Sequence, residues 1–258
     1  MLDVRPIEAF RDNYIWMIHA PEDPHRVAVV DPGDAQPVLA ALASGRLKLE
    51  SILATHHHAD HVGGIAALVA ATGAEVFGPA RDRMPVECTR LAGGDRARIA
   101  SLGIEFAVID VPGHTAGHIA LVGHGVLFSG DTLFSAGCGR LFEGTAGQML
   151  ASLDSLAELP GGTRVFCGHE YTEANLRFAL AVEPGNSAIM DYVKRAAVLR
   201  GEGRPTLPST IELENRVNPF LRTRVENVKS SAERRTGRML PTPAAVFAEV
   251  RSWKDTFR

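Results

Sequence analysis

The sequence predicts an α/β fold, and two features of its first two thirds support that prediction. Short runs rich in Val, Ile, Leu and Phe end in Gly, Pro or Asp, which is typical of buried strands. Between some of these runs, apolar residues recur every three or four positions and glycine closes the segment, which is typical of helices. The expected strands lie at 13–20, 26–33, 51–56, 74–79, 104–113, 118–131 and 164–170, and the expected helices at 34–45 and 63–73.

The sequence changes character after about residue 170. Four consecutive stretches there have helical periodicity, and two of them begin at helix-start signals, PST at 208–210 and Thr242-Pro243. The charged stretch 228–240 is expected to be a solvated loop or helix face rather than a binding patch. We therefore predict two domains, an α/β domain at 1–170 and a helical domain at 171–258.

The composition is that of an ordinary globular protein. Hydrophobic residues make up 45% of the 258 residues and charged residues 22%, and the net charge of −3 argues against a nucleic-acid partner. The three cysteines, Cys88, Cys138 and Cys167, form no CxxC motif and indicate a reducing compartment. Neither a signal-peptide pattern nor a run of about 18 apolar residues is present, so we expect a cytoplasmic protein without a membrane partner.

The ten residues THHHADHVGG, at positions 55–64, crowd four histidines and an aspartate into six positions. They follow an expected strand, and in extended backbone alternate side chains share one face. His56 and His58 therefore point together, and His57 points away. The first two are candidate metal ligands, whereas His57 is not expected to be one.

A second pair of donors, Asp60 and His61, follows as the chain turns toward the helix expected from Gly63. Two pairs from one loop could serve two adjacent metal ions, but a catalytic zinc needs three protein ligands, so others must come from elsewhere. Three expected strands end in glycine followed by a potential ligand, and strand ends are where sites gather in open sheets. The three residues are His114 after Gly113, Asp131 after Gly130 and His169 after Gly168.

These donors are sufficient for two ions ~3.5–4 Å apart, an arrangement used for hydrolysis. One ion takes nitrogens from His56, His58 and His114; the other takes Asp60, His61 and His169; Asp131 bridges both. Imidazole and carboxylate ligands suit zinc, iron or manganese, and we expect two divalent ions with zinc ahead of the others. A structural zinc site is the alternative, but such sites favour cysteine and fill all four positions.

The remaining histidines and cysteines are expected to have supporting roles. His118 lies close to His114 in sequence and could orient a ligand through its other nitrogen. A nucleophilic cysteine would need an activating base, so we expect Cys138 and Cys167 to be packing residues. The histidines read as non-ligands are His19, His25, His57, His118 and His124.

The motif THHHADHVGG, with the later His114, Asp131 and His169, resembles the metal-binding pattern of the metallo-β-lactamase superfamily. The resemblance implies an αββα sandwich with the metals at one edge. Further stretches along nearly the whole chain look like glyoxalase II, the hydroxyacylglutathione hydrolases. They are RDNYIW, GDTLFSAGCGRLFEGT (130–145), CGHEYTEANLRFA (167–179), PSTIELENRVNPFLR (208–222) and RSWKDTF (251–257).

This second resemblance implies hydrolysis of the thioester S-D-lactoylglutathione, and of related S-2-hydroxyacylglutathiones, to D-lactate and glutathione. The reaction completes methylglyoxal detoxification. A metal-bridging hydroxide would attack the thioester carbonyl, with Asp60 orienting it and Asp131 holding both ions as the second catalytic residue. Domain 1–170 would then be catalytic, and domain 171–258 would bind the substrate.

The resemblance also implies glutathione contacts at Arg140, Tyr171, Arg251 and Lys254. Cationic donors suit a ligand that carries two carboxylates, and Arg251 and Lys254 lie three apart on one helix face. Where some relatives have tyrosine, this chain has Phe142. The loss of one hydrogen bond there typically costs ~0.5–1.5 kcal/mol.

Four other functions fit the motif less well. A persulfide dioxygenase uses one iron, whereas here the second ligand set is complete. A lactonase or β-lactamase would leave the basic residues idle, a nuclease would need a basic exosite, and a non-catalytic module would have a damaged ligand set. We expect a monomer, because the helical tail is committed to the substrate.

Overall fold

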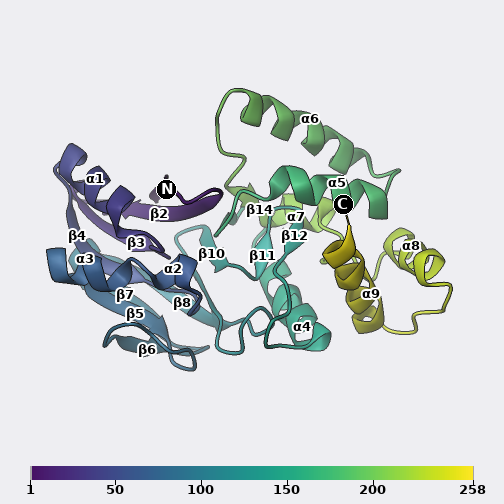
Figure 1. The fold of residues 1–258 in the computed structure, drawn as a ribbon, viewed down its shortest axis with the longest axis horizontal. Coiled ribbons are helices and arrows are strands. Elements are labelled where there is room, and N and C mark those ends of the chain that lie inside the picture. The colour runs from purple at the N-terminus through teal and green to yellow at the C-terminus, as the bar shows by residue number, and fades with distance from the viewer. Residues whose placement is uncertain (1, 258) are drawn as a thin grey trace. The chain divides into compact units, whose positions relative to one another are not determined.

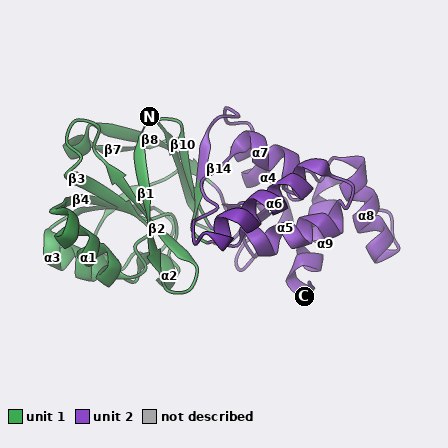
Figure 2. Cartoon of the chain, turned by 90° about the horizontal axis from the view of Figure 1, so that it is seen from above, with its two compact units in different colours: residues 1–110, 115–130, 166–169 green, residues 111–114, 131–165, 170–258 purple. Residues whose placement is uncertain are grey.

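The computed structural model describes residues 2–257, and the chain divides into two compact units (Figure 2). Unit 1 comprises the residues up to 110 together with 115–130 and 166–169. Unit 2 comprises 111–114, 131–165 and the residues from 170 onward. The chain therefore passes between the units several times before its helical C-terminal part.

Unit 1 contains a six-stranded sheet whose strands follow in chain order. The first three strands pair antiparallel, and the pairing becomes parallel from the third strand onward. The strands are β1 (Asp3–Ala9), β2 (Asn13–His19), β3 (Arg26–Val30), β4 (Lys48–Leu53), β5 (Glu75–Pro79) and β6 (Thr89–Leu91). Because β3 and β4 are parallel, their carboxyl ends meet at one edge of the sheet, where Asp31 and Thr55 follow.

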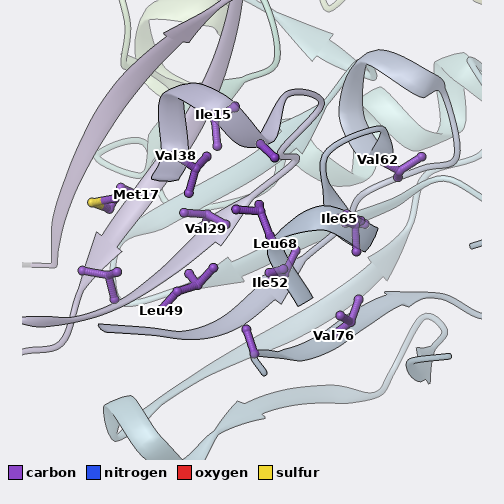
Figure 3. Close-up of a cluster of buried hydrophobic side chains, with 14 of the residues drawn as sticks. Ile15, Met17, Val29, Val38, Leu49, Ile52, Val62, Ile65, Leu68 and Val76 are labelled. Atoms are coloured by element: carbon purple, nitrogen blue, oxygen red, sulfur yellow. The ribbon is translucent and has the colours of Figure 1, made fainter. Parts of the chain in front are cut away.

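Helices α1 (Ala35–Gly45), α2 (Ala59–Val62) and α3 (Ile65–Thr72) belong to the same unit, and α1 and α3 pack against this sheet (Figure 1). Figure 3 shows the core between them, with Val38 of α1 and Leu68 of α3 meeting strand residues such as Ile52. These side chains are fully buried, and burying such a side chain contributes about 1.5–3 kcal/mol. This core fixes the sheet edge that carries the candidate site.

A second sheet packs against the other face of the first. In unit 1 it contains β7 (Arg96–Ile99), β8 (Ile104–Asp110), β9 (Ile119–Gly123), β10 (Val126–Gly130) and the end of β13 (Arg164–Cys167), with the short helix η1 (Ala100–Leu102) after β7. The ring of Trp16 from β2 lies 4.9 Å from that of Phe166, which lies 5.5 Å from that of Phe128. Strand β2 is therefore buried on both faces, as its continuous apolar run predicts.

Unit 2 is mainly helical. It contains α4 (Ala146–Ala157), α5 (Thr172–Val182), α6 (Ser187–Gly201), α7 (Ile211–Val217), α8 (Glu226–Thr236) and α9 (Pro243–Thr256), the hairpin β11 (Leu133–Phe134) and β12 (Gly137–Cys138), and β14 (Ser209–Thr210), which pairs with the start of β13. Thr210 and Thr242 accept hydrogen bonds from the backbone N–H groups of Leu213 and Ala245, which confirms both helix-start signals. Helices α5, α6 and α7 share an apolar core that includes Leu176, Ile189, Tyr192 and Val217.

Some sequence predictions of elements need correction. The single strand expected at 118–131 is wrong, because the chain reverses at His124-Gly125, both at positive φ, and forms the hairpin β9–β10. The helix expected at 63–73 is confirmed as α3, but a separate short helix, α2, precedes it and carries Asp60 and His61. Helix α4 was missed, although Thr145 and Gln148 form a capping box at its start. Stretch 228–240 contains most of α8, in agreement with a helix face.

No helix in the described part of the chain is long and apolar enough to cross a membrane.

Candidate functional site

The loop after β4 is anchored by Asp31, which follows the neighbouring strand β3. The Asp31 carboxylate accepts hydrogen bonds from the backbone N–H and the hydroxyl of Thr55, both at 2.7 Å. It also accepts from Nδ1 of His61 at 3.1 Å. All three residues are buried. A single carboxylate from β3 thus fixes the start of the histidine-rich loop and the ring of a candidate ligand.

Unit 1 brings Asp60, His61 and His169 together, as the sequence predicts. Asp60 Oδ2 lies 3.6 Å from His61 Nε2 and 3.4 Å from His169 Nε2. The other ring nitrogen of His169 donates to Asp12 at 2.8 Å, and Asn13 donates to Asp60 Oδ2 at 3.1 Å.

These distances suit a bound metal ion. One donor atom of each of the three residues lies within 4.8 Å of the others. Each Nδ1 atom of the two histidines is bound to a carboxylate, so each Nε2 atom is turned toward Asp60. Two imidazole nitrogens and a carboxylate oxygen form a donor set for zinc, iron or manganese, and carboxylates on the outer nitrogens are the usual support for metal-bound histidines. The residues therefore fit the metal that the sequence predicts.

His56 and His58 also lie together in unit 1, where His56 is fully buried. The Nε2 atom of His56 lies 3.2 Å from Nδ1 of His58. His57 instead contacts Asp82, whose carboxylate oxygen is 2.9 Å from its Nδ1. The His118 ring stacks on that of His56, with centroids 4.6 Å apart. His57 thus points elsewhere, and His118 lies beside a candidate ligand.

His114 and Asp131 lie together in unit 2, and both are buried. His114 Nε2 is 3.5 Å from an Asp131 carboxylate oxygen. Its Nδ1 donates to the carbonyl of Arg140 at 2.9 Å. A side chain at Gly139 would overlap the carbonyl of Asp131, so glycine is required at this close approach. In both units, therefore, the Nε2 atom of a candidate histidine ligand lies close to the carboxylate of a candidate aspartate ligand.

The four candidate glutathione contacts all belong to unit 2. Arg251 is buried on α9, where it donates to the carbonyl of Cys138 at 2.8 Å and to Asp255 at 3.0 Å. Lys254 donates to the carbonyl of Ala174 at 3.3 Å, and its pKa is lowered to about 8 by partial burial and then by the nearby arginines, Arg251 first. Arg251 and Lys254 are thus buried or partly buried, and do not lie on a solvated helix face.

The other two candidate contacts and the cysteines complete this region. Arg140 is exposed and lies 3.8 Å from Asp255, and Tyr171 packs against the ring of Phe134. Burial raises the pKa of the Cys138 thiol to about 11, so the group stays protonated near neutral pH. This state agrees with a packing role for Cys138.

Sequence reasoning missed three residues that hold the candidate ligands: Asp12, Asn13 and Asp31. Asp31 lies near the end of the strand expected at 26–33, in VVDPGD, and the ends of expected strands were the criterion used for His114, Asp131 and His169. That signal could have found Asp31. Asp12 lies in the turn before β2 and Asn13 is the first residue of β2, and nothing local in the sequence indicates that they reach the site.

Two family models cover most of the chain. Residues 10–87 and 89–169 match the metallo-beta-lactamase superfamily, and residues 170–257 match the hydroxyacylglutathione hydrolase C-terminus. The structure is similar to that of ETHE1 from Myxococcus xanthus, with a TM-score of 0.66, 25% identity and 98% of each chain covered. The fold and the histidine-rich loop therefore define a protein of the metallo-β-lactamase superfamily, which confirms the predicted α/β fold class.

Two further comparisons concern the activity and the metal. The hydroxyacylglutathione hydrolase of Albidiferax ferrireducens is 57% identical over 257 residues, which cover 98% of each chain. A crystal structure of TTHA1623 in a di-iron-bound form has a TM-score of 0.60 and 28% identity, and covers 84% of this chain and 100% of that one. The chain belongs to the hydroxyacylglutathione hydrolase family.

Proposed function

We propose that the chain hydrolyses S-D-lactoylglutathione, and related S-2-hydroxyacylglutathiones, to D-lactate and glutathione as the second step of methylglyoxal detoxification. The observation that carries this proposal is the match of residues 170–257 to the hydroxyacylglutathione hydrolase C-terminus. The histidine-rich loop lies in the part that matches the superfamily as a whole, whereas the model that matches this helical region is that of the hydrolase. The hydroxyacylglutathione hydrolase of Albidiferax ferrireducens is 57% identical over 98% of this chain.

In this proposal the candidate ligands would hold two metal ions. One ion would take Asp60, His61 and His169. The other would take His56, His58 and His114, and Asp131 would serve both. A pair of divalent ions, zinc ahead of iron or manganese, supplies Lewis acidity and a nucleophile at neutral pH. Asp60 keeps an oxygen beside Asn13 and both histidines, where it orients the reacting groups.

The cations of unit 2 hold the glutathione part of the substrate. Arg140 and Lys254 offer charge for its carboxylates, Tyr171 offers a hydroxyl, and Arg251 adds charge while it holds the carbonyl of Cys138. In this proposal residues 1–170 form the catalytic domain and residues 171–258 the substrate-binding domain. We further propose a monomer in the cytoplasm, a location in keeping with three cysteines that form no CxxC motif.

A substrate panel tests the proposal. The purified protein is assayed with S-D-lactoylglutathione, a lactone, a β-lactam and glutathione persulfide with oxygen consumption recorded. We expect the glutathione thioester to have the highest kcat/KM by at least about 100-fold, because the cations of unit 2 bind the glutathione carboxylates and the other substrates lack these contacts or the thioester. Preference for the lactone or the β-lactam, or oxygen consumption with the persulfide, would assign the chain to another reaction.

A further inference from the structure

Residues 134–140 of unit 2 form a stretch whose backbone is held by side chains from other elements. It includes the turn between β11 and β12 and ends at Arg140. Helices α5, α7 and α9, together with Asn218 just after α7, provide the side chains that bind it. Asn218 donates to the carbonyls of Phe134 (3.2 Å) and Gly137 (2.9 Å), Asn175 to Ser135 (3.0 Å) and Arg251 to Cys138 (2.8 Å), while Glu214 accepts from the N–H of Ala136 (2.8 Å).

Glu214 of α7 lies at the centre of this network and is fully buried. The same carboxylate oxygen that binds the N–H of Ala136 accepts a hydrogen bond from Asn218 at 3.0 Å. Ala136 has a φ of 53°, a conformation that costs energy for a residue with a side chain. The strained turn therefore depends on the hydrogen bond that the N–H of Ala136 donates to Glu214. Glu214 also fixes the side-chain amide of Asn218, which donates to carbonyls on both sides of Ala136.

The C-terminal end of residues 134–140 contains a candidate glutathione contact, Arg140, and lies beside the candidate metal ligands of unit 2. The carbonyl of Arg140 accepts from Nδ1 of His114, and the N–H of Gly139 donates to the carbonyl of Thr132, next to Asp131. A displacement of the turn at Ala136 would be transmitted along this short hairpin to Arg140.

The surroundings of Glu214 are polar but uncharged. Burial raises its pKa to about 7, and the groups that lower it in smaller measure are Ser209, the N–H of Ala136, Asn218 and Ser135, whose hydroxyl contacts Tyr192 at 2.7 Å. Within the described residues, Oε1 has no hydrogen-bond partner. Ionisation near neutral pH would therefore place a charge in a buried environment beneath the turn, which is costly.

We propose that Glu214 is a positioning residue that fixes residues 134–140 and thereby places Arg140 for the carboxylates of the glutathione substrate. This inference rests on the proposed function. Glu214 does not touch the substrate and acts through the backbone of Ala136.

Kinetics of two variants test the inference. Glu214→Ala removes the acceptor, and we expect KM for S-D-lactoylglutathione to rise about tenfold with kcat changed less than about threefold, because ground-state binding is lost. Glu214→Gln keeps an acceptor oxygen and should restore KM to within about twofold. Glu212→Ala, which removes an exposed carboxylate from the same helix, is the matched control. An unchanged KM in Glu214→Ala would overturn the inference.

A neutral thioester separates positioning from general damage. S-Lactoyl-N-acetylcysteamine carries no carboxylate, so its kcat/KM should be nearly the same in Glu214→Ala and wild type. An equal loss with both substrates would show that the residue only supports the fold, and would contradict the inference.

A pH profile serves if Glu214→Ala does not fold. We expect KM of the wild type to rise as pH increases through about 7, when Glu214 ionises, and this inflection should be absent in Glu214→Gln. Identical profiles would overturn the inference. If the wild type fails to hydrolyse the thioester, the proposed function fails. Amide hydrogen exchange at Ala136 then still tests the contact with Glu214. After correction for the intrinsic exchange rate, we expect exchange at pH 8 to be faster in the wild type than in Glu214→Gln.

Discussion

Three of the proposed ligand histidines are oriented in the same way. Nδ1 of His61 donates to Asp31, Nδ1 of His169 donates to Asp12, and Nδ1 of His114 donates to a backbone carbonyl. Each bond places the ring proton on Nδ1 and leaves the lone pair on Nε2, the atom that lies near a carboxylate. The chain therefore sets the tautomer that a metal ion needs before any ion binds.

Substitution at Asp131 tests the proposed bridging ligand at the residue scale. We expect Asp131→Ala to bind fewer than two ions per chain and to lose at least about 1,000-fold in kcat, because removal of a bridge uncouples the two ions. Metal analysis of the purified variant, alongside its turnover, provides the measurement. Asp191→Ala, at an exposed position on α6, is the control. Two ions and full turnover in Asp131→Ala would refute the bridge.

Lys254 predicts a pH dependence for substrate binding. Its pKa is lowered to about 8, so the ammonium is lost as pH rises through that value. We expect kcat/KM for the glutathione thioester to fall above about pH 8, since this ratio reports groups of the free enzyme. Lys254→Arg should flatten that limb because arginine stays charged, whereas Lys194→Arg, at an exposed position on α6, should not. The same fall in all three proteins would contradict this role for Lys254.

At the scale of elements, the site depends on how closely α2 approaches the loop after β3. A Cβ atom at Gly33 would overlap the backbone carbonyl of Asp60, so no other residue fits without moving α2. Helix α2 carries Asp60 and His61. The glycine after the β3 strand end is thus a requirement of the proposed metal site rather than of the strand.

Gly33→Ala tests this dependence. We expect the variant to fold but to lose at least about tenfold in metal affinity, the size of effect seen when residues that support ligands are changed. Competition with a chelator measures this affinity. Gly147→Ala is the matched control, because a Cβ at that position meets no neighbour within 4 Å and its effect should be neutral. Equal metal affinity in both variants would show that α2 tolerates the shift.

Much of the fold and of the candidate ligand set is readable from sequence because it is encoded locally. The pattern HHHADH places its donors in six residues, and the three later donors each follow an apolar strand and a glycine. The anchors are different in kind. His169 depends on Asp12, 157 residues away along the chain, and no local pattern marks such a pair. The same holds for Glu214, whose role depends on a turn 78 residues earlier.

Some elements were missed for physical reasons. The run 118–131 is apolar throughout because β9 and β10 are both buried, so the turn between them has only His124-Gly125 as a signal. Arg251 was expected on a helix face beside Lys254, but its guanidinium is buried against the carbonyl of Cys138. Periodicity places a residue on a face, and only tertiary contacts show what covers that face.

At the scale of the whole molecule, we propose that the chain is a two-metal glutathione thioesterase. The most direct test is to remove bound metal from the purified chain, add zinc stepwise, and record bound metal and turnover of S-D-lactoylglutathione on the same sample. We predict that turnover rises with zinc and saturates at about two ions per chain. Saturation at one ion, or full turnover in the metal-free protein, would contradict the central claim.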